Sequence, residues 1–245
     1  MLNTQKNLFT LFCCSLLLLL GWGCTEETQF DSVDRDRTYL HFLNAYPGKE
    51  AVDITFETFD QTQDVASNLR FLESWPNNGY ASLLTSTDTV NGKGGVLIRV
   101  QDHDTGEELV PPIFKNLTGD RQFTFILMDS VGKPIVVRAE DGVNIEEPAA
   151  FVRLMNVNRF VQSASLQTKQ GEEIIRSLNF LNYSSYQSVI PQTYTFYIVN
   201  DQTGLPLDSI TNVALRFNKS YSFFLTHDAS GNPIGGLRIL DSNVN

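Results

Sequence analysis

Residues 122–127 read Gln-Phe-Thr-Phe-Ile-Leu, and residues 220–225 read Ser-Tyr-Ser-Phe-Phe-Leu. In both stretches an aromatic side chain recurs at every second position, at Phe123 and Phe125 and again at Tyr221 and Phe223. Successive side chains of a β-strand point to opposite faces, so this alternation predicts a strand with one apolar face. We therefore expect both stretches to be strands whose four aromatic side chains point into a core.

The two stretches belong to a longer internal repeat. Five blocks match in the same order, and the offset between them falls only from 112 to 98 residues. The matched blocks are 39–44 with 151–156, 69–72 with 178–181, 96–100 with 194–198, 122–127 with 220–225, and Asp129, Gly132 and Pro134 with Asp228, Gly231 and Pro233. Collinear blocks of this kind predict two copies of one domain. We place them at about residues 38–143 and 149–245, joined by a short acidic segment that ends at Pro148.

Turn signals interrupt the alternating blocks, for example at residues 46–48, 76–79 and 104–106. No segment after residue 24 has a sustained helical period. The sequence therefore predicts that each copy has about seven short strands in two packed antiparallel sheets. The expected fold class is all-β, with two tandem immunoglobulin-like antiparallel β-sandwich domains.

The N-terminal segment resembles a bacterial lipoprotein signal peptide. Lys6 precedes a run of 13 apolar and small residues, and Gly-Trp-Gly then leads to Cys24. A membrane-spanning helix needs about 20 residues, so the run favours a signal peptide over residues 1–23. We expect Cys24 to carry the lipid and residues 24–37 to form an acidic tether. Thr25, Glu26 and Glu27 resemble the export signal of Bacteroidetes surface lipoproteins, which predicts an outer-membrane protein exposed at the cell surface; a plain solvated tether is the alternative.

Charge and cysteine content exclude several classes of function. The chain has 18 Lys and Arg against 28 Asp and Glu, a net charge of -10, and removal of residues 1–23, which contain Lys6 and no acid, brings it to -11. So acidic a chain is not expected to bind nucleic acid, and its membrane contact is expected through the lipid alone. Cys13 and Cys14 lie in the signal peptide, so after Cys24 no cysteine remains for a disulfide, a thiolate nucleophile or a metal site.

Residues 44–54, Asn-Ala-Tyr-Pro-Gly-Lys-Glu-Ala-Val-Asp-Ile, resemble the opening of the family called Domain of Unknown Function 4397. In this chain Asn44 stands where that family often has His, Tyr46 where it has Ser, and Gly48 where it has Asp. The second copy lacks the turn. The resemblance implies a secreted or surface β-sandwich that often occurs in tandem, and it implies no catalytic residue.

Three groups of residues are candidates for chemistry. His41, His103 and His227 lie in or beside expected strands, with no nucleophile motif and no metal-ligand spacing, so we interpret them as ordinary histidines. Residues 102–108 hint at a calcium loop, but the second copy keeps a similar Asn-Asp-Gln-Thr-Gly run at 200–204, and a shared hairpin turn explains both. Four Asp-Ser/Thr-apolar tripeptides resemble Bacteroidetes O-glycosylation acceptors, beginning at Asp31, Asp88, Asp129 and Asp208.

An aromatic binding loop is the last candidate. Trp75 and Tyr80 flank a turn in the first copy, and Tyr183 and Tyr186 take the corresponding place in the second. These rings are suited to stacking on a sugar or a peptide, although a role in capping the core is the simpler interpretation.

The sequence thus predicts a non-enzymatic surface lipoprotein that acts as a binding or scaffold module, with a surface protein or glycan as partner and no cofactor or metal. Two alternatives stay open: a spacer subunit of an outer-membrane uptake or adhesion complex, and a hydrolase of glycans or peptides, for which no residue set is apparent.

Overall fold

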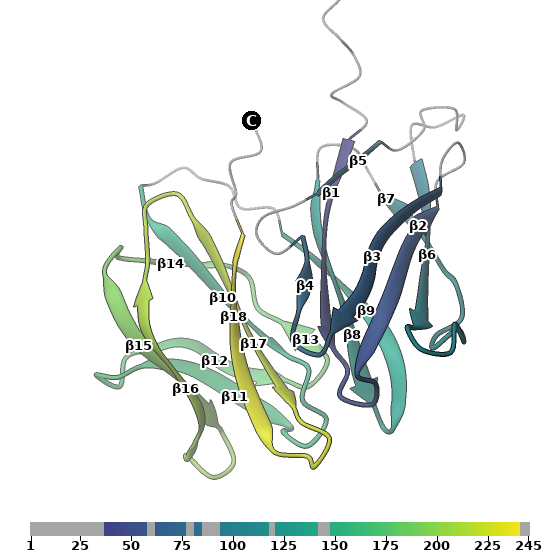
Figure 1. The fold of residues 1–245 in the computed structure, drawn as a ribbon. Coiled ribbons are helices and arrows are strands. Elements are labelled where there is room, and N and C mark those ends of the chain that lie inside the picture. Colours follow the sequence, from purple (N-terminus) through teal and green to yellow (C-terminus); the bar gives the residue numbers. More distant parts are fainter. Residues whose placement is uncertain are drawn as a thin grey trace, which may run out of the picture. The chain divides into compact units, whose positions relative to one another are not determined.

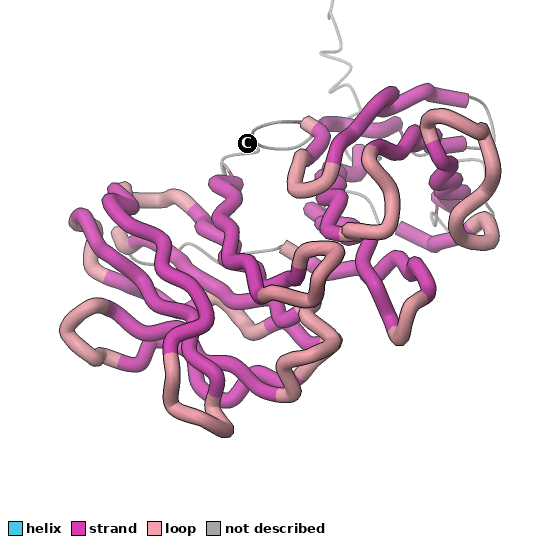
Figure 2. The backbone as a smooth tube through the Cα atoms, turned by 60° about the horizontal axis from the view of Figure 1, so that its bottom comes forward, coloured by secondary structure: helices cyan, strands magenta, loops and turns pink. Residues whose placement is uncertain are grey.

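The computed structural model describes residues 37–57, 62–76, 81–84, 94–117, 121–141 and 148–240. These residues form strands, turns and loops without any helix (Figure 2), so none of the described part offers a helix long and apolar enough to cross a membrane. The all-β fold class is confirmed. Among the described residues each copy has nine strands, where the sequence predicted about seven, and two of the nine in each copy are strands of only two to four residues.

Copy 1 contains two sheets (Figure 1). In the first, β1 lies between β8 and the short strands β4 and β5, and β9 ends the sheet beyond β8. In the second, the order is β3-β2-β6-β7. The bounds are β1 Arg37–Ala45, β2 Ala51–Glu57, β3 Thr62–Arg70, β4 Ser74–Trp75, β5 Ala81–Leu84, β6 Gly94–Asp102, β7 Ile113–Leu117, β8 Gln122–Ser130 and β9 Lys133–Glu140.

Copy 2 repeats this arrangement strand for strand. One sheet has β10 between β17 and the short strands β13 and β14, with β18 outside β17, and the other has the order β12-β11-β15-β16. The bounds are β10 Ala150–Asn156, β11 Ser163–Thr168, β12 Glu173–Asn179, β13 Asn182–Tyr183, β14 Gln187–Val189, β15 Thr193–Asn200, β16 Pro206–Ala214, β17 Ser220–His227 and β18 Pro233–Leu240.

Most neighbouring strands are antiparallel, with one parallel pair in each copy. β1 runs parallel to β8, and β10 runs parallel to β17, with Phe42 opposite Phe125 and Leu154 opposite Phe223. A parallel pair needs a long crossover, and the strands of the second sheet supply it in both copies. The repeated parallel pair shows that the copies share topology as well as sequence.

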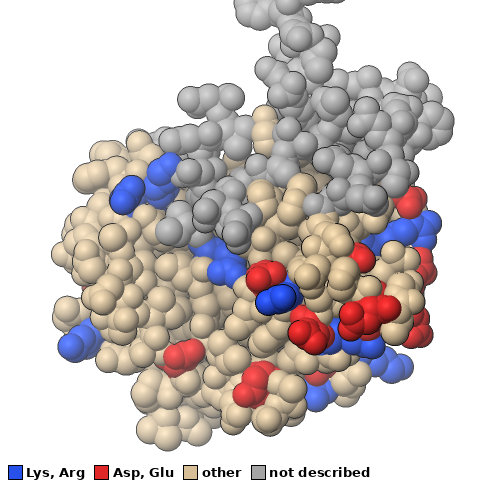
Figure 3. Space-filling model, in the orientation of Figure 1, with Lys and Arg blue, Asp and Glu red and all other residues tan. Residues whose placement is uncertain are grey.

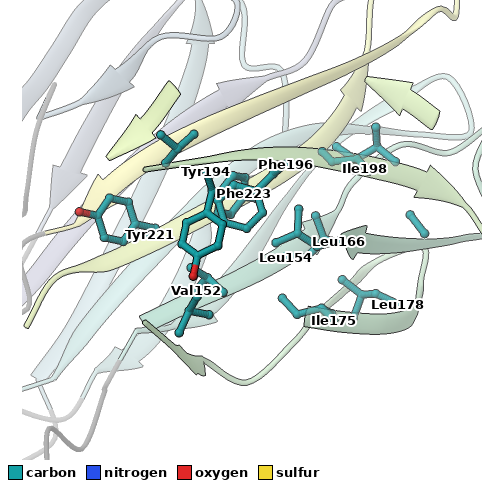
Figure 4. Packing of buried hydrophobic residues seen from close by; sticks show 14 of the residues in the cluster. Val152, Leu154, Leu166, Ile175, Leu178, Tyr194, Phe196, Ile198, Tyr221 and Phe223 are labelled. Carbon is teal, nitrogen blue, oxygen red and sulfur yellow. The ribbon is translucent and has the colours of Figure 1, made fainter. Parts of the chain in front are cut away.

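Each copy has its own apolar core between its two sheets. In copy 1, Phe123 and Phe125 pack with Val52, Ile54 and Phe56, all nearly inaccessible to solvent. In copy 2, Tyr221 and Phe223 pack with residues from β10, β11, β12 and β15, as Figure 4 shows. Phe196 and Phe223 touch with ring centroids 4.7 Å apart. The predicted inward direction of all four aromatic side chains is confirmed.

The four central strands are buried on both faces, where the sequence predicted one. A third cluster contains Ile126, Met128, Met155, Val157 and Phe224, which alternate with the core residues of β8, β10 and β17. The cluster takes residues from both copies, so the outer faces of these strands are covered as well. An apolar residue at every position of a strand is typical of a strand buried on both sides.

A buried polar group accompanies this cluster. Arg153 on β10 is 0% exposed and forms an ion pair with Asp141, which follows β9. Its guanidinium also donates to Ser222 Oγ at 2.8 Å and to the Glu140 carbonyl at 3.1 Å. Thr124 Oγ1 donates to the other Asp141 oxygen at 2.6 Å. These bonds provide partners for a charge pair that burial would otherwise make costly.

Candidate functional site

Several predicted site residues lie outside the described residues: Cys24, Thr25, Glu26, Glu27 and Tyr80. The acceptor-like tripeptides at Asp31 and Asp88 lie there as well. Their assignments stay predictions.

Trp75, the described member of the first aromatic pair, is directed towards the core of copy 1. It is partly buried in β4, and its ring meets Phe56 edge-on with centroids 6.2 Å apart. This contact agrees with the role in capping the core that the sequence left open.

The second aromatic pair lies against Arg153. The Arg153 guanidinium carbon is 4.8 Å from the centre of the Tyr186 ring and 5.9 Å from that of Tyr183. Tyr186 also bonds to Ser222 Oγ at 3.1 Å, and burial raises the pKa of its hydroxyl to about 12. Tyr183 is 45% exposed. Tyr186 is therefore part of the buried polar group, and Tyr183 is the more accessible ring of the two.

The run at residues 102–108 forms a hairpin turn. Asp102 Oδ1 accepts from the amides of Asp104 and Thr105, at 3.0 and 3.1 Å, and its other oxygen pairs with Lys49. Asn200 repeats the motif in copy 2 by accepting from the Gln202 amide at 2.9 Å. Among the described residues no group of three His, Cys, Asp or Glu side chains is placed to hold a metal ion.

The histidines lie in three different settings. His41 is buried on β1, and His103 forms a half-exposed pair with Asp53 at 2.8 Å. His227 is buried at the end of β17, where Nδ1 lies 2.8 Å from the Asp228 carbonyl. A carbonyl only accepts, so Nδ1 carries the hydrogen and Nε2 faces the Asp129 carboxylate at 3.7 Å.

His227 belongs to a cleft that turns from both copies line, here called the turn cleft. Its volume is about 200 Å³. The β1–β2 turn contributes Tyr46, Pro47 and Gly48, β8 contributes Asp129, the segment after β10 contributes Arg159 and Phe160, and the β17–β18 turn contributes His227, Ala229, Ser230 and Gly231. We take the turn cleft as the candidate binding site because it combines an exposed ring with polar side chains that converge on a hollow.

In the turn cleft, an ion pair and ring contacts hold the side chains of Arg159 and Phe160. Arg159 Nε lies 3.2 Å from Asp129 Oδ2, and the guanidinium carbon lies 4.6 Å from the centre of the Phe160 ring. The Phe160 ring also meets His227 edge-on at 4.9 Å. Phe160 nevertheless stays 56% exposed. Its ring is thus fixed from two sides and open on the remaining surface.

Tyr46 also lines the turn cleft. Burial, followed by the nearby Asp129 charge, raises the pKa of its hydroxyl above the ordinary value, so the hydroxyl stays protonated and able to donate. A Cβ atom on Gly48 would lie 2.3 Å from the Tyr46 ring. The large ring at position 46 therefore requires that position 48 carries no side chain.

Equivalent asparagines anchor the chain on each side of the turn cleft. Asn44 Oδ1 accepts from the Tyr46 amide at 3.1 Å, and its Nδ2 donates to the Leu69 carbonyl at 3.0 Å. Asn156, its partner in the repeat, accepts from the Asn158 amide at 3.2 Å and donates to the Leu178 carbonyl at 3.2 Å. Copy 2 therefore keeps the hydrogen bonds of a turn whose sequence it has lost.

The Asn158 side chain then ties the backbone of Phe160 to β17. Its Oδ1 accepts from the Phe160 amide at 2.9 Å, and its Nδ2 donates to the Thr226 carbonyl at 2.7 Å. Sequence reasoning missed Arg159 and Phe160, since they lie in a segment with no alternation and no turn signal. The available clue was the repeat, which aligns Asn158 with Tyr46 and so places the segment at a turn.

The chain resembles known proteins only at low sequence identity. No family model matches the sequence, and no curated protein matches it. Among solved structures, a family CBM26 carbohydrate-binding module from Eubacterium rectale, in complex with maltoheptaose, is 11% identical; the alignment covers 84% of this chain and 96% of that one, with a TM-score of 0.24. A candidate cell adhesion protein from Bacteroides uniformis is 9% identical, with coverages of 84% and 98% and a TM-score of 0.26.

Proposed function

We propose that this chain is a non-enzymatic binding protein of the bacterial cell surface, anchored in the outer membrane through lipid on Cys24. Its membership of the Domain of Unknown Function 4397 family is part of the same proposal. In this proposal the two sandwiches act as a scaffold, and the turn cleft binds a glycan of the surroundings or of another cell.

One observation carries the proposal. Phe160 is 56% exposed, yet Arg159 and His227 hold its ring in place beside a hollow of about 200 Å³. A fixed, exposed ring offers an apolar face at little cost in side-chain entropy, and the neighbouring Arg159 and Tyr46 offer hydrogen-bond donors. An apolar face with polar groups around it is suited to a sugar ring, which has C–H bonds on its faces and hydroxyls on its rim.

The test is a glycan array probed with the full-length chain in detergent, followed by titration of each glycan that binds. We expect Phe160→Ala to weaken binding at least about tenfold, which corresponds to about 1.4 kcal/mol. Phe114→Ala is the matched control, because Phe114 is 63% exposed on β7 and does not line the turn cleft. Glycan binding that both variants leave unchanged would refute the role of the cleft.

The lipid anchor is tested separately. With Cys24 as the acceptor, Cys24→Ser should abolish incorporation of a fatty-acid probe, whereas labelling of the variant would refute the anchor. Protease added to intact cells should remove the domains, and replacement of Glu26 and Glu27 by Ala should protect them. Full protection of the natural chain would place the protein on the periplasmic side.

A further inference from the structure

The central strands of the two copies have matching ends, and one of these ends follows the N-terminal segment. β1 begins at Arg37, directly after residues 24–36, and runs parallel to β8. The Asp141 amide donates to the carbonyl of the first residue of β8 at 2.8 Å, and the Asp141 carboxylate pairs with Arg153 near the start of β10. At the opposite ends of these strands, Thr226 Oγ1 donates to the Ala45 carbonyl at 3.0 Å. β1 and β10 therefore begin at the same end, here called the tether end, which is at the top of Figure 1.

Two large apolar side chains are exposed at the tether end of copy 2. Ile190 follows β14, whose last residue is paired with the first residue of β10, and it is 75% exposed. Phe217 lies in the loop from β16 to β17 and is 59% exposed. The two loops adjoin, because the Leu215 amide donates to the Gln192 carbonyl at 3.0 Å. Ile190 and Phe217, together with Arg216, are here called the tether-end patch.

The internal repeat does not require these side chains. At the offset of 98 residues that holds in this part of the sequence, Phe217 corresponds to Gly119. Arg216 corresponds in the same way to Thr118. Phe217 also lies outside the apolar core of copy 2. Exposed apolar side chains that gather at one place mark a contact with a partner or a membrane, so we look for the surface that covers this patch.

Hydrogen bonds hold the loop that carries Phe217. The Arg216 amide donates to the Tyr221 hydroxyl at 2.9 Å. The Asn218 amide donates to the Ala149 carbonyl at 2.8 Å. Phe217 is therefore presented between two anchored neighbours, and its backbone loses little entropy when the ring is buried against another surface.

The N-terminal segment determines which surface lies near the tether end. Lipid on Cys24, the anchor of the proposed function, leaves residues 24–36, which are 13 residues, between the membrane and β1. An extended chain spans at most about 3.5 Å per residue, so the tether end stays within about 45 Å of the membrane surface. A short link of this kind keeps the effective concentration of the attached surface high, so even a weak contact suffices to hold the patch against it.

Arg216 gives the tether-end patch a positive side chain. The residue is exposed, and Figure 3 shows basic side chains at the upper left, where β16 leads into β17 in Figure 1. The chain as a whole has a net charge of -10 and is repelled by an anionic surface. A basic side chain is attracted to anionic headgroups within a Debye length, so Arg216 favours an approach by this end.

We propose that the tether-end patch docks on the lipid surface that holds the anchor. Ile190 and Phe217 enter the boundary between headgroups and acyl chains, and Arg216 binds the phosphate of a headgroup. The turn cleft begins at Tyr46, directly after β1, and the nine residues of β1 place it up to about 30 Å further from the membrane. Docking thus directs the turn cleft outwards. The inference rests on the proposed anchor at Cys24 and is independent of the ligand of the turn cleft.

The experiment uses the full-length chain, purified in detergent from membranes and reconstituted into vesicles of phosphatidylethanolamine and phosphatidylglycerol. Ile190→Cys, Phe217→Cys and Leu205→Cys are each labelled with a fluorescent maleimide, and quenching by nitroxides on the lipid acyl chains is measured. Leu205 is the matched control, because it is 64% exposed and follows the end of β15, whereas Gln192 precedes its start. We expect quenching at 190 and 217 and none at 205, since docked side chains lie about 5–10 Å deep.

Substitutions test the two parts of the contact. Arg216→Glu should lower the ratio of docked to undocked chain at least about fivefold, which corresponds to about 1 kcal/mol. Lys133→Glu reverses an exposed charge at the start of β9, at the other end of copy 1, and should leave the ratio unchanged. Phe217→Ser should relieve the quenching at 190, and Leu205→Ser should not. Vesicles of phosphatidylcholine should weaken docking in the natural chain and reduce the effect of Arg216→Glu.

The outcomes distinguish failure of docking from failure of the proposed function. Equal quenching at 190, 217 and 205, or no quenching in chains that float with the vesicles, would overturn docking. Energy transfer between labels on separate chains, without quenching, would assign the patch to a second copy and overturn docking as well. A natural chain that takes up the maleimide at Cys24 and does not float would refute the anchor and this inference with it. Docking that persists in Phe160→Ala would show that it does not depend on the turn cleft.

Discussion

At the scale of single residues, the buried Arg153–Asp141 pair is sensitive to the loss of either partner. Arg153→Met leaves the Asp141 carboxylate buried without its guanidinium, and we expect a loss of about 3–5 kcal/mol in the free energy of unfolding. Arg153→Met combined with Asp141→Leu removes both charges and should recover much of that loss, because an apolar pair avoids the desolvation of ions. Urea unfolding of the two variants measures the difference. Equal stabilities would show that Asp141 does not depend on Arg153.

His41 predicts a specific dependence on pH. Burial, followed by the positive charges of Arg238 and Arg153, lowers the pKa of His41 from 6.5 to about 3. Between pH 6.5 and about 3, His41 is protonated in the unfolded chain and neutral in the folded chain. Stability that is complete above pH 6.5 is therefore lost as the pH falls towards 3, by at most about 1.4 kcal/mol per pH unit from this group.

His41→Gln removes this titration, so the stability of the variant should depend less steeply on pH between 6.5 and 4.5. The comparison is made between slopes, because the substitution also changes packing. The carboxylate of Asp102, whose pKa its bond with Lys49 lowers to about 2, titrates below this window. Parallel slopes for the two proteins would contradict a neutral, buried His41.

Single residues also mark the limit of what the sequence could predict. Period-two alternation correctly predicted that Phe123, Phe125, Tyr221 and Phe223 point into the cores, since the apolar face of a half-buried strand packs against the core. The same pattern assigns Arg153 to a solvent-facing position, because it alternates with Val152 and Leu154. Its burial depends on Asp141 and Ser222, whose positions depend on tertiary contacts.

At the scale of elements, the two faces of β17 pack in two different apolar clusters. Phe223 packs in the core of copy 2, whereas Phe224 lies in the cluster that takes residues from both copies, with the Arg238 guanidinium carbon 5.6 Å from the centre of its ring. Gly236 makes room for that ring, since a Cβ atom there would lie 2.0 Å from it. We expect Phe223→Ala and Phe224→Ala each to cost about 3–5 kcal/mol in the full chain.

In residues 149–245 alone the two substitutions should separate. Phe223→Ala should keep its cost there, and Phe224→Ala should lose most of its cost, because the copy-1 side of its cluster is absent. Melting of the four variants measures this. If Phe224→Ala costs as much in the isolated copy as in the full chain, the ring is buried by copy 2 itself.

The strand alternation thus predicted one face of each central strand and left the other unexplained. Apolar residues such as Ile126, Met128 and Phe224 stand at positions where the pattern places solvent-facing side chains. They are visible in the sequence as a break in alternation, and only the presence of a second copy gives them a partner. For the same reason the turn cleft, built from turns of both copies, could not be assembled from either repeat by itself.

At the scale of the whole molecule, the described copies have separate cores and shared contacts. The shared contacts include the third apolar cluster, the Arg153–Asp141 pair, a bond from Thr226 Oγ1 to the Ala45 carbonyl at 3.0 Å, and a bond from the Arg238 guanidinium to the Leu72 carbonyl. Separate cores predict that residues 38–143 and 149–245 each fold when expressed alone. Shared contacts predict that each is less stable alone than in the full chain.

We therefore expect each isolated copy to melt cooperatively, at a lower temperature than the full chain, with no change on adding chelator or reductant. Mixing the two copies should raise both melting temperatures, since binding to the folded state alone stabilises it. Arg153→Met in residues 149–245 should abolish the increase, because it removes the cation that Asp141 of residues 38–143 pairs with.

Arg176→Ala is the matched control on β12, where the side chain is 78% exposed and pairs only within copy 2, with Glu173. Two copies that melt unchanged when mixed would mean that their contacts depend on the covalent join, and copies that fail to fold alone would refute the two-domain organisation.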